Sequence, residues 1–313
     1  MQIARFDLGA FESADADQRA TMAAEVDRIC RETGFLVLEG HGVPDRVIAD
    51  IWDRASAFFA LPPAEKARVA PPRPGDPYGW LGPKTEALAK SRGEDTPPDL
   101  KESFNGGPGA VPEGLDDADA LAFCYAPTPW PDLPGFREAW QAYYAGMEAL
   151  AARIMRVFAA ALHLPDDFFA PHIDAPISAL RALHYPATEG AAELGQQRAG
   201  AHSDYGSLTI LLPQPGSRGL EIERPGGGWE EVPAEPGAFV INIGDLMARW
   251  TADRWVSTLH RVVARPGQPA RQSLAFFHQP NWFAEIRPLD GSDAYPPVFS
   301  GPYLMEKFRA TGS

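Results

Sequence analysis

The chain has 313 residues, with 42 acidic against 28 basic side chains, so its formal net charge is -14. This balance argues against nucleic acid as a partner, because phosphate binding needs clustered lysine and arginine. Hydrophobic residues make up 45% of the chain, enough for a sizeable core in one large domain or two ordinary ones. The two cysteines are too few for a disulfide framework or a Cys-based zinc site, and they fit a reducing compartment. Without a signal-like start or an apolar run near 20 residues, we expect a cytoplasmic protein with no membrane partner.

The first half of the chain has the periodicity of helices. Apolar residues spaced by about 3.6 positions predict a helix from Met22 that ends before Gly34. The apolar run 35–38 predicts a buried strand, and a second helix is expected from Pro44 to the prolines at 62 and 63. A third helix is predicted over 136–162, long enough to back a sheet.

A proline-rich stretch separates the second and third of these helices. Residues 62–134 hold 15 of the 32 prolines, which argues against regular helix or a central strand there. The stretch is too aromatic for a plain linker. We therefore expect an ordered loop that frames a site.

After residue 177 the period of the apolar residues changes from about 3.6 to 2. Candidate strands, most of them separated by Pro-Gly turns, are 180–185, 207–212, 220–223, 229–232, 238–243, 256–264 and 271–279. Many short strands at this spacing predict a sandwich or barrel. The expected fold class is α+β with a mainly β core and a helical N-terminal region. We expect one compact unit, with an N-terminal part over 1–135, a second part over 136–313 and a β core over 173–280.

Three residues could form a metal site. His202 and Asp204 are two positions apart, so in an extended backbone both side chains point to the same side. His260 lies on a later candidate strand, and antiparallel pairing could bring it opposite them. Two neutral imidazoles and one carboxylate, with open positions opposite, are the ligand set of non-haem Fe(II) oxygenases. A His-x-Asp pair by itself is more often a hydrogen-bonded loop pair, so the inference depends on the third residue.

Arg271 and Ser273 repeat the two-residue spacing on an apolar candidate strand. An arginine on the inward face of such a strand is costly to bury unless it meets an anion. A carboxylate bound by the guanidinium and the hydroxyl would satisfy it. The alternative is an internal salt bridge to one of the 42 acidic residues.

The order His202-x-Asp204, His260, Arg271-x-Ser273 resembles the 2-oxoglutarate/Fe(II)-dependent dioxygenase superfamily, in its isopenicillin N synthase-like branch. Segments across most of the chain carry the same resemblance, namely 4–8, 34–37, 40–44, 99–104, 180–186, 242–245, 250–251 and 276–277. The resemblance implies a double-stranded β-helix, or jelly roll, behind a helical N-terminal region.

Carried over by position, the resemblance makes His202, Asp204 and His260 the iron ligands. Arg271, Ser273 and Tyr185 would hold the distal carboxylate of 2-oxoglutarate. Plant members often have Asn two residues before that tyrosine, whereas this chain has Leu183. The implied activity is an oxidoreductase that consumes 2-oxoglutarate and O2.

Three alternatives remain open at this stage. Some family members use no 2-oxoglutarate and keep the Arg-x-Ser pair for a substrate carboxylate. Two imidazoles and a carboxylate also suit a zinc hydrolase. A third possibility is a non-catalytic module that senses 2-oxoglutarate or O2.

The sequence leaves the substrate open, as it does the outcome among hydroxylation, desaturation, cyclisation and ethylene formation. We expect a small organic molecule as partner, and the oligomeric state is not predicted. Candidates for contacts with this substrate are Tyr78, Phe104, Asn105, Trp250 and Phe277, and the role of His278 is left open. A C-terminal helix over 303–308 would pack across the mouth of the site.

Overall fold

The computed structural model describes residues 3–93, 96–188, 190 and 193–311. The helices are α1 (Leu8–Ser13), α2 (Ala16–Glu32), α3 (Asp45–Phe59), α4 (Pro63–Ala67), α5 (Ala118–Ala122), α6 (Phe136–Ala161), α7 (Asp245–Trp250) and α8 (Ser300–Thr311), with short 3-10 turns η1 (Leu88–Arg92) and η2 (Ala170–His172). The strands are β1 (Ala4–Asp7), β2 (Phe35–Glu39), β3 (Gly79–Leu81), β4 (Glu102–Gly106), β5 (Ala179–Tyr185), β6 (Ala199–His202), β7 (Leu208–Pro213), β8 (Leu220–Glu223), β9 (Trp229–Glu231), β10 (Phe239–Ile243), β11 (His260–Val262), β12 (Arg271–His278), β13 (Glu285–Ile286) and β14 (Val298–Phe299).

The helices α3 and α6 form where the sequence predicts them, whereas α2 begins at Ala16, before the expected start at Met22, because a cap fixes its first turn there. The Asp15 side chain accepts from the backbone N–H of Gln18, whose side chain accepts from the Asp15 N–H, a reciprocal capping box. After α2 the chain turns through Gly34 at φ 61°. A Cβ at Gly34 would lie 2.1 Å from the carbonyl oxygen of Val256, so only glycine fits this turn into β2.

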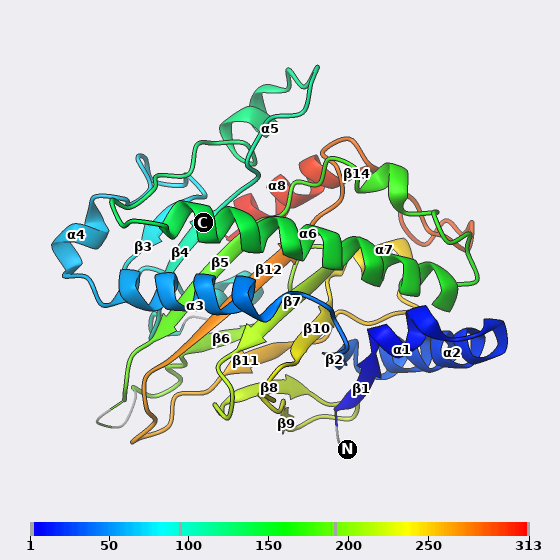
Figure 1. Ribbon diagram of the computed structural model, residues 1–313, viewed down its shortest axis with the longest axis horizontal. Coiled ribbons are helices and arrows are strands. Elements are labelled where there is room, and N and C mark those ends of the chain that lie inside the picture. The colour runs from blue at the N-terminus through cyan, green and yellow to red at the C-terminus, as the bar shows by residue number, and fades with distance from the viewer. Residues whose placement is uncertain (1–2, 94–95, 189, 191–192, 312–313) are drawn as a thin grey trace.

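The strands form two main sheets that face each other. The large sheet has the order β1-β2-β10-β7-β12-β5-β4-β3, and the small sheet has the order β6-β11-β8-β9. Figure 1 shows α6 lying across the large sheet with α3 beside it, while the small sheet lies away from these helices. The expected α+β class with a jelly-roll core and N-terminal helices is confirmed.

The two faces of the large sheet carry different cores. Along β12, Leu274 and Phe276 belong to the hydrophobic cluster that contains the stripe of α6, whereas Ala275 belongs to a separate cluster between the two sheets, with Phe277 packed against it. This alternation follows from the two-residue period of a strand. Side chains on the Ala275 face therefore point into the interior of the jelly roll, where the candidate site lies.

The expectation of neither regular helix nor central strand over 62–134 is wrong, because the short helices α4 and α5 and the strand β4 lie within it, with Pro63 accommodated in the first turn of α4. β4 pairs with β3 on one side and β5 on the other, inside the large sheet. None of the prolines of this stretch falls between Pro98 and Pro108, so nothing in 99–107 prevents a paired strand. β6 was also missed, because its sequence Ala-Gly-Ala-His lacks the branched residues typical of strands.

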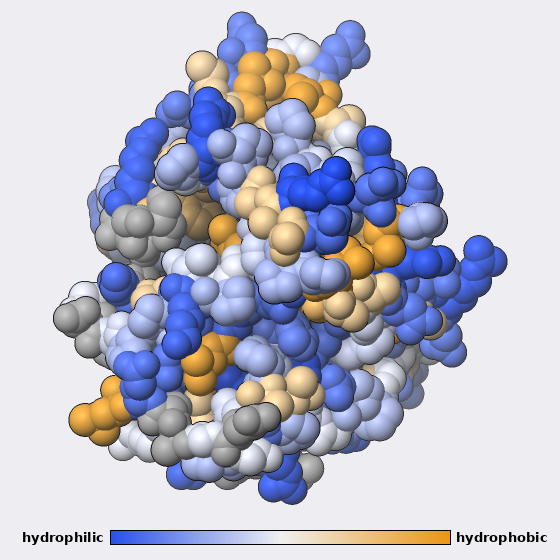
Figure 2. Space-filling model, turned by 90° about the vertical axis from the view of Figure 1, so that its left-hand side faces the viewer, coloured by the Kyte–Doolittle hydropathy of each residue, from blue (hydrophilic) through white to orange (hydrophobic). Residues whose placement is uncertain are grey.

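Over 3–93, 96–188, 190 and 193–311, no helix is long and apolar enough to cross a bilayer. Figure 2 shows one face of the molecule as largely hydrophilic, with small separated hydrophobic areas.

Candidate metal centre

Three side chains suited to a metal converge between the two sheets. His202 is the last residue of β6, Asp204 follows two residues later, and His260 is the first residue of β11. β6 and β11 pair antiparallel with His260 opposite His202, as the sequence predicted. Their ligand atoms lie within 4.8 Å of one another. Oδ1 of Asp204 is 3.9 Å from Nε2 of His202 and 3.8 Å from Nε2 of His260.

Backbone carbonyls orient the two imidazoles. Nδ1 of His202 donates to the carbonyl oxygen of Gly200 at 2.7 Å, and Nδ1 of His260 donates to that of Thr258 at 3.2 Å. These bonds place the ring proton on Nδ1 and leave the Nε2 lone pair for a metal. Both Nε2 atoms face Asp204, so the rings are set for one shared ion.

Two neutral side chains hold the carboxylate of Asp204. Its Oδ2 accepts from Oγ1 of Thr209 at 2.6 Å and from Nδ2 of Asn242 at 2.7 Å. Oδ1 is thereby left to bind a metal. Sequence reasoning missed both residues, although Asn242 stood out as the polar residue within the buried strand β10.

Burial sets the charge of the ligands. Desolvation, reinforced by the neighbouring His260, lowers the pKa of His202 to about 3, so its imidazole is neutral at pH 7. Burial would raise the pKa of Asp204, but the two histidines and the bonds from Asn242 and Thr209 outweigh it and keep the pKa below its usual value. Two neutral nitrogens and one anionic oxygen are a donor set that fits Fe(II).

Arg271 is buried at one end of the same interior. It pairs with Tyr185 across β12 and β5, and its guanidinium carbon lies 4.5 Å from the Tyr185 ring centroid. Its Nη1 donates to Oγ of Ser217 at 3.3 Å, while Nε is buried without a partner. Over the ranges that the structure describes, no carboxylate contacts this guanidinium, so the internal salt bridge considered from the sequence is not found there.

A second buried arginine, which the sequence did not indicate, lies near Arg271. Arg198 is 1% exposed, and its Nη2 donates to the carbonyl oxygens of Pro186 and Pro269, both at 2.8 Å. Desolvation lowers the pKa of Arg198, and the positive charge of Arg271 lowers it further. This end of the interior is therefore electropositive, as an anion site requires.

Comparison with known proteins agrees with this geometry. Residues 3–133 match the family described as "non-haem dioxygenase in morphine synthesis N-terminal", and residues 176–280 match the "2OG-Fe(II) oxygenase superfamily". The validamycin A dioxygenase of Streptomyces hygroscopicus subsp. limoneus is 36% identical over 96% of this chain and 84% of its own length. The chain belongs to the 2-oxoglutarate/Fe(II)-dependent dioxygenases.

Other relatives of this dioxygenase support the same assignment. The proline hydroxylase buaE of Petromyces alliaceus is 31% identical over 92% of this chain and 91% of its own length. A full-length Neurospora crassa protein, solved in complex with alpha-KG (2-oxoglutarate), is 30% identical, with a TM-score of 0.85 over 99% of this chain and 96% of that chain. The family thus makes the protein an oxidoreductase, with His202, Asp204 and His260 as its Fe(II) triad.

The five candidates for substrate contacts separate into two groups. Phe277 packs against the cluster between the sheets, and Asn105 lies on the same face because its neighbour Phe104 is in the helix-facing core. Phe104 belongs to the helix-facing core, where its ring is 5.1 Å from that of Trp140. Trp250 packs in the same core, and the hydroxyl of Tyr78 donates to the carbonyl oxygen of Cys124. Phe104 points toward the helices because successive side chains of a strand point to opposite faces, and its neighbour Asn105 points into the interior between the sheets.

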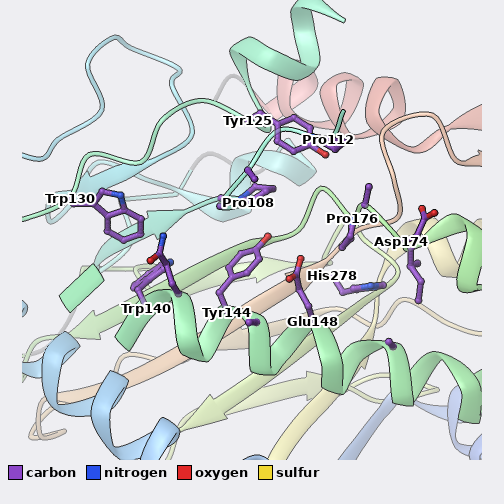
Figure 3. Close-up of a pocket in the computed structure, with 18 residues that line it drawn as sticks. Pro108, Pro112, Tyr125, Trp130, Trp140, Tyr144, Glu148, Asp174, Pro176 and His278 are labelled. Atoms are coloured by element: carbon purple, nitrogen blue, oxygen red, sulfur yellow. The ribbon is translucent and has the colours of Figure 1, made fainter. Parts of the chain in front are cut away.

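His278 faces away from the metal centre. It follows the inward Phe277, so it lies on the helix side, where it lines a separate cavity of about 480 Å³. Figure 3 shows that Glu148 and Tyr144 on α6 and Pro108 on the loop after β4 line this cavity with it. Its Nδ1 is 2.6 Å from Oγ of Ser207. The sequence could not decide whether His278 touches substrate, and the structure puts it on the face opposite the Fe(II) triad.

Proposed function

We propose that this dioxygenase oxidises a small organic metabolite by hydroxylation, desaturation or cyclisation, with 2-oxoglutarate and O2 converted to succinate and CO2. The observation that carries the proposal is Arg271, a buried guanidinium without a carboxylate partner among the described residues, in the same interior as the triad. A buried charge of this kind needs an anion.

The distal carboxylate of 2-oxoglutarate is that anion. Arg271 would bind it in a bidentate manner, with Ser273, two residues along the same face of β12, donating its hydroxyl. The Tyr185 ring lies 4.5 Å from the guanidinium carbon and contributes a cation–π contact on the same face. Fe(II) bound at the triad would supply the activation of O2, while the chain supplies the ligands, the anchor and an interior screened from water.

Named relatives support a small substrate. A second structure of the Neurospora crassa protein, 28% identical with a TM-score of 0.85, contains thymine beside alpha-KG. The Streptomyces relative is named for validamycin A. Both names indicate small organic molecules, and we propose the same class for this chain.

Succinate release tests the proposal directly. Purified protein with Fe(II), 2-oxoglutarate and O2 is screened against a metabolite collection, and succinate above the background without substrate is expected for at least one compound. Asp204→Ala should abolish this release, because it removes one of three ligands. O2 consumption that is independent of 2-oxoglutarate would favour a family member that does not use it. Tightly bound zinc without decarboxylation would favour hydrolysis.

A further inference from the structure

The interior face beside the metal centre carries an amide and a guanidinium side by side. Asn105 on β4 pairs with Arg181 on β5 in the large sheet. The guanidinium carbon of Arg181 lies 6.0 Å from the ring centroid of Phe277. Phe277 in turn pairs with Thr209, the residue that donates to the iron ligand Asp204. These side chains therefore form one continuous wall that leads to the metal ligands.

The side-chain amide of Asn105 is buried and makes no hydrogen bond to the described residues. Its residue exposure is 3%, and neither Oδ1 nor Nδ2 has a hydrogen-bond partner among the residues that the structure describes. A buried amide normally has both groups paired, because leaving them unpaired is costly. A ligand that satisfies Asn105 must offer an acceptor and a donor next to each other.

The charges around Asn105 neutralise one another. Glu86 accepts from Nη1 of Arg181 at 3.1 Å and contacts Nζ of Lys101 at 3.2 Å. Burial would raise the pKa of Glu86, but Arg181 and Lys101 outweigh it and hold the pKa at about 2, so the carboxylate stays ionised. Asp99 lies 3.7 Å from the same ammonium group. With two cations facing two carboxyl groups, this wall does not require a charged ligand.

Phe277 supplies a flat apolar surface on the same wall. It is the only residue of β12 that is not fully buried. A partly exposed aromatic ring in such a wall can pack against a flat ring of a ligand.

We propose that Asn105 is a substrate-binding residue that recognises the cis amide edge of a planar heterocycle, with Nδ2 donating to the ring carbonyl and Oδ1 accepting from the adjacent ring N–H. The ring would stack on Phe277, and the remaining N–H groups of Arg181 would face its other polar atoms. The inference rests on the proposed function, and it narrows the substrate class to neutral cyclic amides and imides.

A matched pair of probes tests the recognition of the edge. 2-Pyridone presents the carbonyl and N–H together, whereas N-methyl-2-pyridone lacks the N–H. Calorimetry under anaerobic conditions, on protein loaded with Fe(II) and 2-oxoglutarate, should give binding at least about ten-fold weaker for the methylated probe. Asn105→Leu should remove this discrimination. Equal binding of the two probes to the unaltered protein would overturn the inference.

Thermal unfolding provides a second, independent readout. Leucine has nearly the shape of asparagine and no polar atoms, so Asn105→Leu should raise the unfolding midpoint of the ligand-free protein. Asn281→Leu is the matched control, because the Asn281 amide is already paired, Nδ2 donating to the carbonyl oxygen of Pro171 and Oδ1 accepting from the N–H of Ala175. The control should lower the midpoint and keep the discrimination between probes. A lower midpoint for Asn105→Leu would contradict the proposal, because it would mean that the amide is satisfied without a ligand.

Failure of the two proposals can be distinguished. Calorimetry measures the recognition of the probes whether or not turnover occurs, so it tests Asn105 alone. Absence of succinate from the unaltered protein with every compound would refute the proposed function. Succinate release together with equal binding of both probes would refute only the role of Asn105.

Discussion

Replacement of Thr209 by valine should weaken the metal centre without altering a metal ligand. Valine keeps the shape of threonine but removes the hydroxyl that donates to Oδ2 of Asp204 at 2.6 Å. Both residues are buried, and a hydrogen bond to a charged group is worth about 1.5–3 kcal/mol. Since the bond from Asn242 remains, the carboxylate stays near its position while its orientation becomes less fixed. We expect Fe(II) affinity to fall about 10–100-fold, the usual effect of losing such a partner.

Competition with a chelator under anaerobic conditions measures this affinity. Thr251→Val is the matched control, because Thr251 is also buried and its hydroxyl donates to the carbonyl oxygens of Met247 and Ala248, neither of which is a metal ligand. The control should bind Fe(II) as tightly as the unaltered protein, even if it unfolds at a lower temperature. If Thr209→Val binds Fe(II) within two-fold of the unaltered protein, the bond to Oδ2 does not orient the ligand, and the reasoning is refuted.

Three further predictions concern the cosubstrate anchor, a buried ion pair and the C-terminal helix. Arg271→Lys should raise the KM for 2-oxoglutarate at least about ten-fold, because the ammonium group of lysine cannot replace the two parallel hydrogen bonds of a planar guanidinium. An unchanged KM would contradict the role of Arg271 as the carboxylate anchor. Lys66→Met should destabilise folding by about 3–5 kcal/mol in urea unfolding at pH 7, since it leaves the buried carboxylate of Glu102, 2.7 Å from Nζ in the native pair, without its cation. Burial would raise the pKa of Glu102, but hydrogen bonds from His184, Lys66 and Trp80 outweigh burial and lower the pKa. The ionised Glu102 therefore contributes its full stabilisation above pH 4.5, and this contribution is lost as the pH falls through the lowered pKa. A loss of stability that begins above pH 6 would not come from Glu102. Deletion of 301–313 should weaken substrate binding and leave 2-oxoglutarate binding unchanged in calorimetry, because α8 packs against Tyr205 beside the iron ligand Asp204.

Periodicity and spacing predicted the parts of this structure that depend on local pattern. The stripe of α6 and the alternation of β12 are regular over many residues, and the register His260 opposite His202 follows from antiparallel pairing. Strand β4 was missed because its proline-rich surroundings masked a short segment free of proline. The C-terminal helix was expected and is present, although it begins at Ser300, earlier than the apolar pattern indicated.

The remainder of the site depends on contacts between residues distant in sequence. Whether Arg271 meets a carboxylate cannot be decided by counting acidic residues, because the answer depends on which side chains the fold brings into the interior. The same holds for Asn105, whose unpaired amide becomes visible only when every neighbour is in place. Asn242 was detectable in principle, since a polar residue within a buried strand needs a partner, but its partner Asp204 lies 38 positions away.

The two sheets divide the chemistry between them. The small sheet carries His202 and His260, whereas the large sheet carries the anchor Arg271 and the groups that orient Asp204. The distance between iron and cosubstrate anchor is therefore set by how the sheets pack, and not by either sheet alone. One direct contact across this interface is the edge-to-face pair of Phe35 on β2 with the iron ligand His260, at 5.4 Å between ring centroids. Because α6 packs against α2 and α3 on one side of the large sheet, these helices make that sheet the frame against which the metal ligands of the small sheet are positioned. The N-terminal helices, which contribute none of the ligands His202, Asp204 and His260, thus support the sheet that bears the anchor.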